Sequence, residues 1–205
     1  MAFEITNQIL REAIAAKGLP VPASGVLHIF GIRGAVPWQP PTPDGKYYLS
    51  LKENIVDQWN DTIGVFGTAF GTWLGTVDPG APYTQDPMNA SGCAHLEDGR
   101  WQYHVGDHKG HSALVQSAPV TVWRDADKDS TQDAGEVEES GMFGIDIHAG
   151  EGSVVGDWSA GCQVVWSKNG WSGPEWTAFF DTVKASGMQS WYYWLLDAED
   201  VAPDE

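Results

Sequence analysis

The sequence has little positive charge. Among its 205 residues, 11 are Lys or Arg and 28 are Asp or Glu, which gives a formal net charge of −17. Because phosphate contacts require Lys and Arg, this composition argues against nucleic acid as a partner and against general attraction to an anionic membrane surface. A polyanionic substrate would need a local positive site, for which Arg33, Lys109 and Arg124 are available.

The chain also lacks long apolar runs. No stretch approaches the roughly 18 apolar residues that mark a membrane-spanning helix, and the first residues have neither the basic start nor the apolar stretch of a signal peptide. We therefore expect no membrane span. We expect a monomer that is cytoplasmic as encoded, unless another route releases it or delivers it to its site of action.

Only two cysteines occur, Cys93 and Cys162. A disulfide between them would require an oxidising compartment and would occupy Cys162. The alternatives are a small buried residue and a free thiol with a chemical role. Tryptophan, by contrast, is abundant, with 11 residues. Those near Cys162 in sequence could stack on sugar rings or could simply cover the core.

Short apolar segments rich in β-branched and aromatic residues dominate the chain, with Gly, Pro, Asn and Asp between them. Apolar residues at helical spacing predict a helix within residues 1–18 and another at 174–185. The expected fold is one mostly β domain over residues 1–205, a sandwich or barrel-like structure with about two peripheral helices and an acidic, frayed tail at 197–205. Strands are predicted at 26–32, 47–51, 63–70, 72–77, 101–105, 113–116, 120–123, 143–147, 162–166 and 190–196.

A histidine and a cysteine lie close together in two glycine-containing motifs. Residues 143–150 read Phe-Gly-Ile-Asp-Ile-His-Ala-Gly, and residues 157–165 read Asp-Trp-Ser-Ala-Gly-Cys-Gln-Val-Val. A thiol needs a base or a positive field to become a nucleophile, and His148 could take the proton of Cys162. Asp146 would face the same side of a strand as His148 and could orient or charge its imidazole. The alternative is a buried histidine beside an unreactive thiol.

These motifs resemble the active-site signature of the L,D-transpeptidase (YkuD-type) family, in which His-Gly is followed by a variable loop and then Ser/Thr-x-Gly-Cys. The resemblance covers residues 100–166. It implies that Cys162 is the acyl-accepting nucleophile and His148 its base. It also implies that Ser159 and Gly161 shape the loop and the oxyanion site.

The sequence departs from the family pattern at two places. Ala149 stands where the family prefers glycine, and Gln163 is followed by valine where an aliphatic residue followed by arginine is common. Arg33, which lies between Gly31 and Gly34, is a candidate carboxylate clamp in a chain with so few cations. The candidate substrate-binding residues are Arg33, Asp157, Trp158 and Gln163.

An acidic segment at 125–136 precedes these motifs. Measured against the twelve-residue calcium loop, it carries acids at positions 1, 3, 5, 9 and 12, namely Asp125, Asp127, Asp129, Asp133 and Glu136. Ser130 at position 6, where glycine is needed, and flanks that are not helical argue against an EF-hand. An EF-like loop with a structural Ca²⁺ remains one interpretation, and a solvated acidic hairpin is the other.

Three histidines, His104, His108 and His111, form a further cluster in the sequence. Three imidazoles can bind zinc, but the glycines between them predict a turn rather than one helical face. We expect an exposed loop from which one histidine reaches the site.

The expected function is that of an enzyme acting on cell-wall peptidoglycan, which the resemblance implies. It would use Cys162 for acyl transfer on stem peptides, as a peptidase or transpeptidase with an endolysin-like role as one form, and it would need no cofactor for the chemistry. One alternative is a glycan-cleaving hydrolase or lyase on the same scaffold, with Asp146 or Asp157 as general acid or base on peptidoglycan or another polysaccharide. The other is a calcium-stabilised binding module without catalysis.

Overall fold

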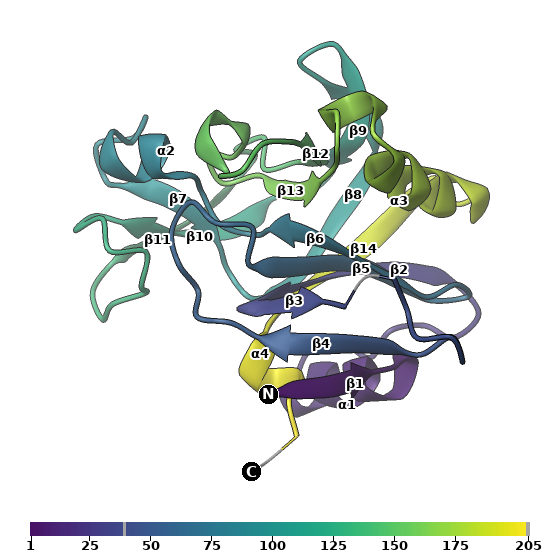
Figure 1. Cartoon of the computed structure of the whole chain (residues 1–205). Coiled ribbons are helices and arrows are strands. Elements are labelled where there is room, and N and C mark those ends of the chain that lie inside the picture. Colours follow the sequence, from purple (N-terminus) through teal and green to yellow (C-terminus); the bar gives the residue numbers. More distant parts are fainter. Residues whose placement is uncertain (39, 204–205) are drawn as a thin grey trace.

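A closed barrel of strands forms the centre of the fold in a computed structural model, which describes residues 1–38 and 40–203 (Figure 1). The strand order around the barrel is β12-β13-β6-β5-β2-β14-β8-β9. The barrel strands are β2 (Leu27–Arg33), β5 (Asp61–Gly67), β6 (Gly71–Thr76), β8 (Gly99–His108), β9 (His111–Gln116), β12 (Ile147–Gly150), β13 (Gln163–Trp166) and β14 (Ser190–Asp197).

Two smaller sheets flank the barrel. One has the order β1-β4-β3 and the other β11-β10-β7. Their strands are β1 (Ala2–Ile5), β3 (Ala35–Pro37), β4 (Tyr47–Leu51), β7 (Cys93–Leu96), β10 (Val120–Asp125) and β11 (Val137–Gly141). The helices are α1 (Asn7–Ala16), α2 (Ala81–Gln85), α3 (Pro174–Ala185) and α4 (Ala198–Val201).

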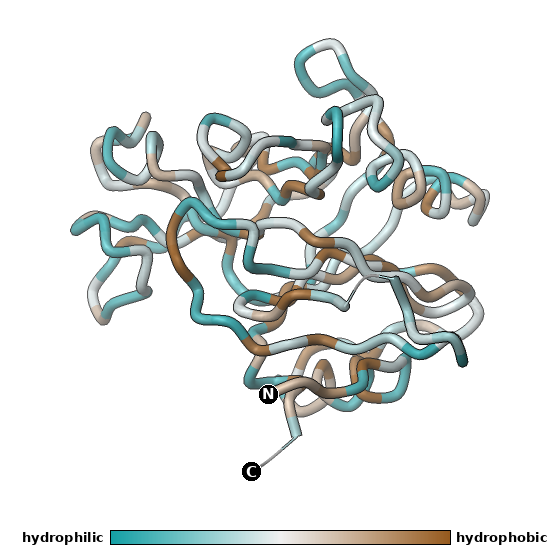
Figure 2. Tube along the Cα trace, in the orientation of Figure 1, coloured by the Kyte–Doolittle hydropathy of each residue, from teal (hydrophilic) through white to brown (hydrophobic). Residues whose placement is uncertain are grey.

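The core has two parts because the central strands are buried on both faces. Ile29 of β2 and Tyr193 of β14 point to one side and pack with α3. Their neighbours Phe30 and Trp194 point to the other side and pack with α1 and β1. Side chains alternate along a strand, so a strand covered on both faces reads as a continuous apolar run. Figure 1 shows α1 and α3 on opposite sides of the barrel, and Figure 2 shows hydrophobic colouring on strands, on helices and on the loop between β4 and β5.

The prediction of a mostly β, barrel-like fold with a helix near each end is confirmed, but the N-terminal helix is shorter than expected. Residues 2–5 form β1, which pairs with β4 in antiparallel register. The helix begins only after Thr6, whose hydroxyl accepts a hydrogen bond from the amide of Ile9 and caps it. The helix prediction at 174–185 matches α3.

Two other local predictions are wrong. Of the strand expected at 143–147, only Ile147 is in a strand, β12. Residues 143–146 form an irregular loop, because the amides of Phe143, Gly144 and Ile145 all donate to the side-chain oxygen of Gln116 instead of to a strand. The tail expected to be frayed at 197–205 contains α4, which begins with reciprocal capping between Asp197 and Asp200. Residues 204–205 of that tail lie outside the described residues.

Buried ion pairs centred on Arg33 join three parts of the fold. Its guanidinium contacts the carboxylates of Asp78, Asp98 and Asp197 at 3.0–3.2 Å and donates to the carbonyl oxygen of Leu96 at 3.1 Å. Burial alone would raise the pKa of Asp78, but the charge of Arg33 and the hydrogen bond from His95 hold it below its ordinary value. Arg33 therefore neutralises acids of its own chain. The sequence analysis expected it to bind a substrate carboxylate, and in the structure it is not free to do so.

No helix within residues 1–38 and 40–203 combines the length and the apolar character needed to cross a membrane.

Replacing Arg33 should reveal the cost of removing this guanidinium from Asp78 and Asp197, whereas Asp98 is also paired with Lys17. We expect Arg33→Met to lower the free energy of unfolding by about 3–5 kcal/mol, because breaking a buried pair leaves uncompensated charge. Urea unfolding followed by circular dichroism would measure the change. Lys46→Met is the matched control, since Lys46 forms only an exposed pair with Glu4. Equal unfolding midpoints for the two variants would contradict the expectation.

Candidate functional site

The parallel pairing of β12 with β13 brings the two sequence motifs together. His148 of β12 is the register partner of Val164 in β13, and Cys162 directly precedes β13. The amide of Gln163 donates to the carbonyl oxygen of Asp146 at 2.9 Å, which fixes the start of the pair. The sequence spacing therefore becomes spatial proximity because the two motifs begin adjacent parallel strands.

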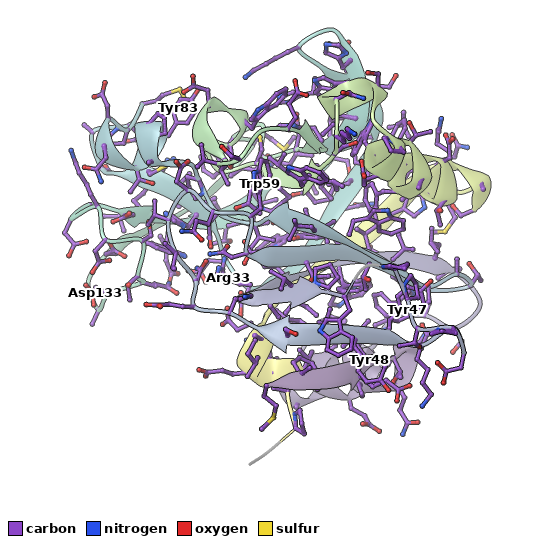
Figure 3. The ribbon with its side chains drawn as sticks, in the orientation of Figure 1. Arg33, Tyr47, Tyr48, Trp59, Tyr83 and Asp133 are labelled. Carbon is purple, nitrogen blue, oxygen red and sulfur yellow. The ribbon has the colours of Figure 1, made fainter. Side chains whose placement is uncertain are left out.

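The crossover between these strands, residues 151–162, is anchored at its start. The carbonyl oxygen of Gly152 accepts hydrogen bonds from the indole nitrogens of Trp59 at 3.1 Å and Trp166 at 3.0 Å. Figure 3 labels Trp59 in this part of the molecule. The segment also contains a single turn of 3-10 helix, Gly156–Trp158, tied by a hydrogen bond from the Gly156 amide to Asp57. Ordinary parallel strands need a connection of about this length.

Ser159 and Gly161 shape the loop that carries the cysteine. The buried Ser159 hydroxyl donates to the carbonyl oxygen of Cys162 at 2.8 Å and accepts from the amide of Gly161 at 3.2 Å. Gly161 has φ +124°, and a Cβ there would lie 2.7 Å from the carbonyl oxygen of Ala94. Only glycine fits this position. The Gly161 amide is bonded within the loop, so an oxyanion would have to be bound by other donors.

The two cysteines are free thiols, which contradicts the disulfide alternative. Cys93 is buried and Cys162 is partly exposed, and both line the same cavity. The Sγ atom of Cys162 lies 3.5 Å from the carbonyl oxygen of Gly144, to which it donates, and 3.5 Å from the amide nitrogen of Asp146. These two weak contacts hold the thiol against the loop at 143–146.

His148 has the hydrogen-bonding pattern of a base. Its Nδ1 lies 2.8 Å from the carbonyl oxygen of Ala149, and because a carbonyl only accepts, Nδ1 carries the proton. The lone pair of the neutral ring is then on Nε2. That atom is buried and has no hydrogen-bond partner among the described residues. His148 therefore keeps an accepting nitrogen available next to Cys162.

A second histidine, His108 at the end of β8, completes the group. Its ring stacks on that of His148 with 4.4 Å between centroids, and its Nδ1 lies 2.8 Å from Oδ2 of Asp146. The other oxygen of Asp146 accepts from the amide of Gln116 at 3.0 Å. The sequence analysis paired Asp146 with His148. In the structure the carboxylate of Asp146 instead contacts His108, because Asp146 lies before β12 rather than within it.

Both reactive groups are neutral at rest. Burial raises the pKa of Cys162 to about 12, an effect that the nearby charge of Asp146 reinforces. Burial lowers the pKa of His148 to about 4, and the positive charge of Lys109 acts in the same direction. The site therefore holds a thiol and an imidazole rather than an ion pair. A nucleophile would form only as the proton leaves Sγ during attack.

Two cavities meet at His108 and Lys109. The first has a volume of about 320 Å³, and the second has a volume of about 350 Å³ and contains the predicted substrate residues Asp157 and Trp158. The first is lined by Tyr83, Met88, Asn89, Cys162, Phe143 and Arg124 among others, and the second by His111, His148, Asp157, Trp158 and Trp171. Figure 3 labels Tyr83, on α2, and Arg33, which lines neither cavity.

Gln163, also predicted to contact substrate, is fully buried. Its Nε2 donates to the carbonyl oxygen of Val77 at 3.1 Å, and its Oε1 accepts from the hydroxyl of Tyr193 at 2.6 Å. It lines neither of the two cavities. The cations next to the site are Lys109 and Arg124, and Arg124 is already paired with Glu139 at 2.7 Å.

The acidic segment forms a loop between β10 and β11, so its flanks are strands. Its five acids do not form one group. Carboxylate oxygens of Asp127, Asp129 and Asp133 lie within 4.8 Å of one another, and a second group of this kind contains Asp125, Asp127 and Glu136. Partial desolvation and the neighbouring acids raise the pKa of Asp127. Both groups offer the hard oxygen donors that Ca²⁺ takes, so the calcium site stays a prediction.

The three neighbouring histidines separate in the structure. His108 and His111 are register partners across the β8–β9 hairpin, whose turn residues Lys109 and Gly110 both have positive φ. His111 stacks on Trp171 with 4.5 Å between centroids, and His104 lines another cavity. Within residues 1–38 and 40–203 they form no common group of metal ligands, and only His108 approaches Cys162.

Comparison of the chain with protein-family models, with curated proteins and with solved structures finds no match.

The sequence analysis expected one of the three neighbouring histidines to reach the site and named Lys109 as a possible positive group, but it did not identify His108 as that histidine and gave Trp171 no role. The hairpin signal was present, since Lys109-Gly110 favours a tight turn after a strand. That signal places His108 at the end of a hairpin. It does not say which other strand end lies beside it, because that depends on closure of the barrel.

We expect the native thiol of Cys162 to be alkylated slowly at neutral pH, because its raised pKa leaves little thiolate. Iodoacetamide labelling of Cys93→Ser, in which Cys162 is the remaining cysteine, should be on the order of 100-fold slower at pH 7.5 than in denaturant and should rise with pH. Mass spectrometry would give the rates. Rapid native alkylation at pH 6–7, which requires a thiolate–imidazolium pair, would contradict this description.

If the acidic loop binds calcium, millimolar Ca²⁺ should raise the melting temperature by roughly 2–5 °C, and a chelator should reverse the change. The double variant Asp127→Asn/Asp133→Asn should lose the response, because it removes charge from both acidic groups. Asp181→Asn, at an exposed acid on α3, is the matched control. A response that is absent from the native chain, or equal in both variants, would reject the site.

Proposed function

We propose that the chain is a cysteine-dependent acyl-transfer enzyme of the L,D-transpeptidase type that acts on the stem peptides of peptidoglycan. The observation that supports this most directly is the pairing of a partly exposed thiol with an imidazole whose accepting nitrogen is buried and unpartnered. Both lie at the start of adjacent parallel strands, and each lines a cavity.

The proposed chemistry follows from the neutral pair. Sγ of Cys162 attacks a peptide carbonyl carbon while its proton passes to His148, so a C–S bond forms and the carbonyl becomes an oxyanion. The imidazolium then gives the proton to the leaving amine as the C–N bond breaks. The resulting thioester is attacked by water in a peptidase or by a second amine in a transpeptidase. The hydrogen bond to the Ala149 carbonyl keeps His148 in the tautomer that this cycle requires.

The two cavities support a reaction with two partners. One reaches the thiol and the other reaches His148, and they share His108 and Lys109. An acyl donor in the first and an amine or water in the second would both approach the same centre. Lys109 gives the first cavity a positive group in an acidic chain, which suits the carboxylates of stem peptides, whereas Arg124 is paired with Glu139.

A glycan-cleaving activity is the second candidate, and the aromatic wall of the second cavity favours it. Trp158 and Trp171 lie beside Asp157 there, and tryptophan faces bind sugar rings. Asp146, the other acid considered, is already bonded to His108 and to the amide of Gln116. A carboxylate mechanism would therefore have to begin at Asp157.

Digestion of purified bacterial peptidoglycan tests the proposal. The native chain should release or join stem peptides, and Cys162→Ala should lower that activity by at least about 1000-fold, because the step that forms the thioester is lost. Asp181→Asn, at an exposed acid on α3 that lines neither of these two cavities, is the control and should keep the activity. Mass spectrometry of the products distinguishes hydrolysis from cross-linking. Cut glycan strands that persist in Cys162→Ala would support the second candidate instead. If neither the native chain nor any variant forms a product, a binding module without catalysis becomes the better interpretation.

A further inference from the structure

The three side chains between the cavities have the composition of a transition-metal site. One nitrogen of His108, one nitrogen of His148 and Sγ of Cys162 all lie within 4.8 Å of one another. Zinc bonds of about 2.0 Å to nitrogen and 2.3 Å to sulfur hold tetrahedral ligand atoms roughly 3.5 Å apart. A contraction of about 1 Å, which small side-chain rotations supply, would bring the three atoms onto one ion.

The surroundings of both imidazoles fit metal ligation independently of this distance. Histidines that bind a metal almost always donate their other N–H group to a carboxylate or a backbone carbonyl. Nδ1 of His108 faces the carboxylate of Asp146, and Nδ1 of His148 faces the carbonyl oxygen of Ala149, each at 2.8 Å. This leaves Nε2 of each ring for a ligand.

The unpartnered nitrogen of His148 is further evidence for a bound metal ion. The residue is only 2% exposed, yet its Nε2 has no hydrogen-bond partner among the described residues. A buried polar atom without a partner carries a desolvation penalty, and a bound ion removes that penalty. Proton transfer from one thiol requires one imidazole, whereas two imidazoles that are both oriented through Nδ1 match a metal site more closely.

We propose that His108, His148 and Cys162 bind one zinc-type divalent metal ion, with a fourth position open to the cavities. A borderline-soft set of two nitrogens and one sulfur favours zinc over calcium or magnesium. Binding forms an Sγ–metal bond and releases the thiol proton to solvent. While the metal is bound, Sγ is not free to attack a carbonyl, so metal and acyl donor compete for it.

Titration with Co²⁺, which reports tetrahedral coordination and thiolate ligation by its absorption, tests the site. Cys93→Ser leaves Cys162 as the single thiol and should bind one Co²⁺ with a sulfur-to-cobalt charge-transfer band that excess Zn²⁺ abolishes. Cys162→Ser should lose the band. His108→Ala and His148→Ala should weaken binding at least about 10-fold, and His104→Ala, on the same strand as His108 but outside the group, should not.

Protection supplies a readout that does not depend on a variant's folding. Zn²⁺ should slow alkylation of Cys162 in the native chain, located by mass mapping of the labelled peptide, and a chelator should restore it. A folded Cys93→Ser chain without the charge-transfer band overturns the proposal, as does a band that both histidine variants leave unchanged. Cobalt bound equally by Cys162→Ser would place the ion on the acidic loop and would also overturn it.

The metal proposal uses the same cysteine as the proposed acyl transfer but does not depend on it. Peptidoglycan digestion in chelator separates the two. Acyl transfer that continues without metal and stops with Zn²⁺ agrees with both proposals. Metal binding without any digestion rejects acyl transfer alone, and digestion by a chain that never binds Co²⁺ rejects the metal site alone.

Discussion

The register of β12 against β13 is the constraint on which the rest of the site depends. Because the two strands are parallel, their starting ends lie at the same edge, and Cys162 comes beside His148 across a crossover of a dozen residues. A slip by one residue would turn His148 to the other face of the sheet. The loop bonds of Ser159 and the positive φ of Gly161 then set where Sγ points.

Burial keeps the site at the start of β12 and β13 uncharged, in contrast to the acidic surface of the molecule. The chain carries a formal charge of −17, yet the thiol and the imidazole at its centre are both neutral, because desolvation disfavours the thiolate and the imidazolium alike. The buried charges are concentrated instead around Arg33, where three carboxylates surround one guanidinium. Charge therefore serves to join strands of the fold, and the site keeps uncharged groups that can exchange a proton or receive an ion.

The two histidines explain why one arrangement supports two chemistries. Each ring is fixed through Nδ1, one by Asp146 and one by the carbonyl of Ala149, so each offers Nε2. A lone pair next to a thiol accepts its proton during nucleophilic attack, and the same lone pair with the deprotonated sulfur ligates a metal. Both proposed chemistries require that the imidazole rings are held in a fixed orientation. The Gln116 amide contributes to this without touching a substrate, because it donates to Asp146, which in turn contacts His108.

The sequence by itself determined the strand-rich composition and the helix at 174–185, because apolar periodicity is a local signal, whereas the resemblance implied the pairing of Cys162 with His148. The sequence did not determine that Asp146 binds His108, that Arg33 and Gln163 are used inside the fold, or that residues 143–146 form a loop held by Gln116. Each of these depends on which distant strand becomes a neighbour. Closure of the barrel decides that, since it brings β8, β9, β12 and β13 to one edge, and no local pattern in the chain encodes it.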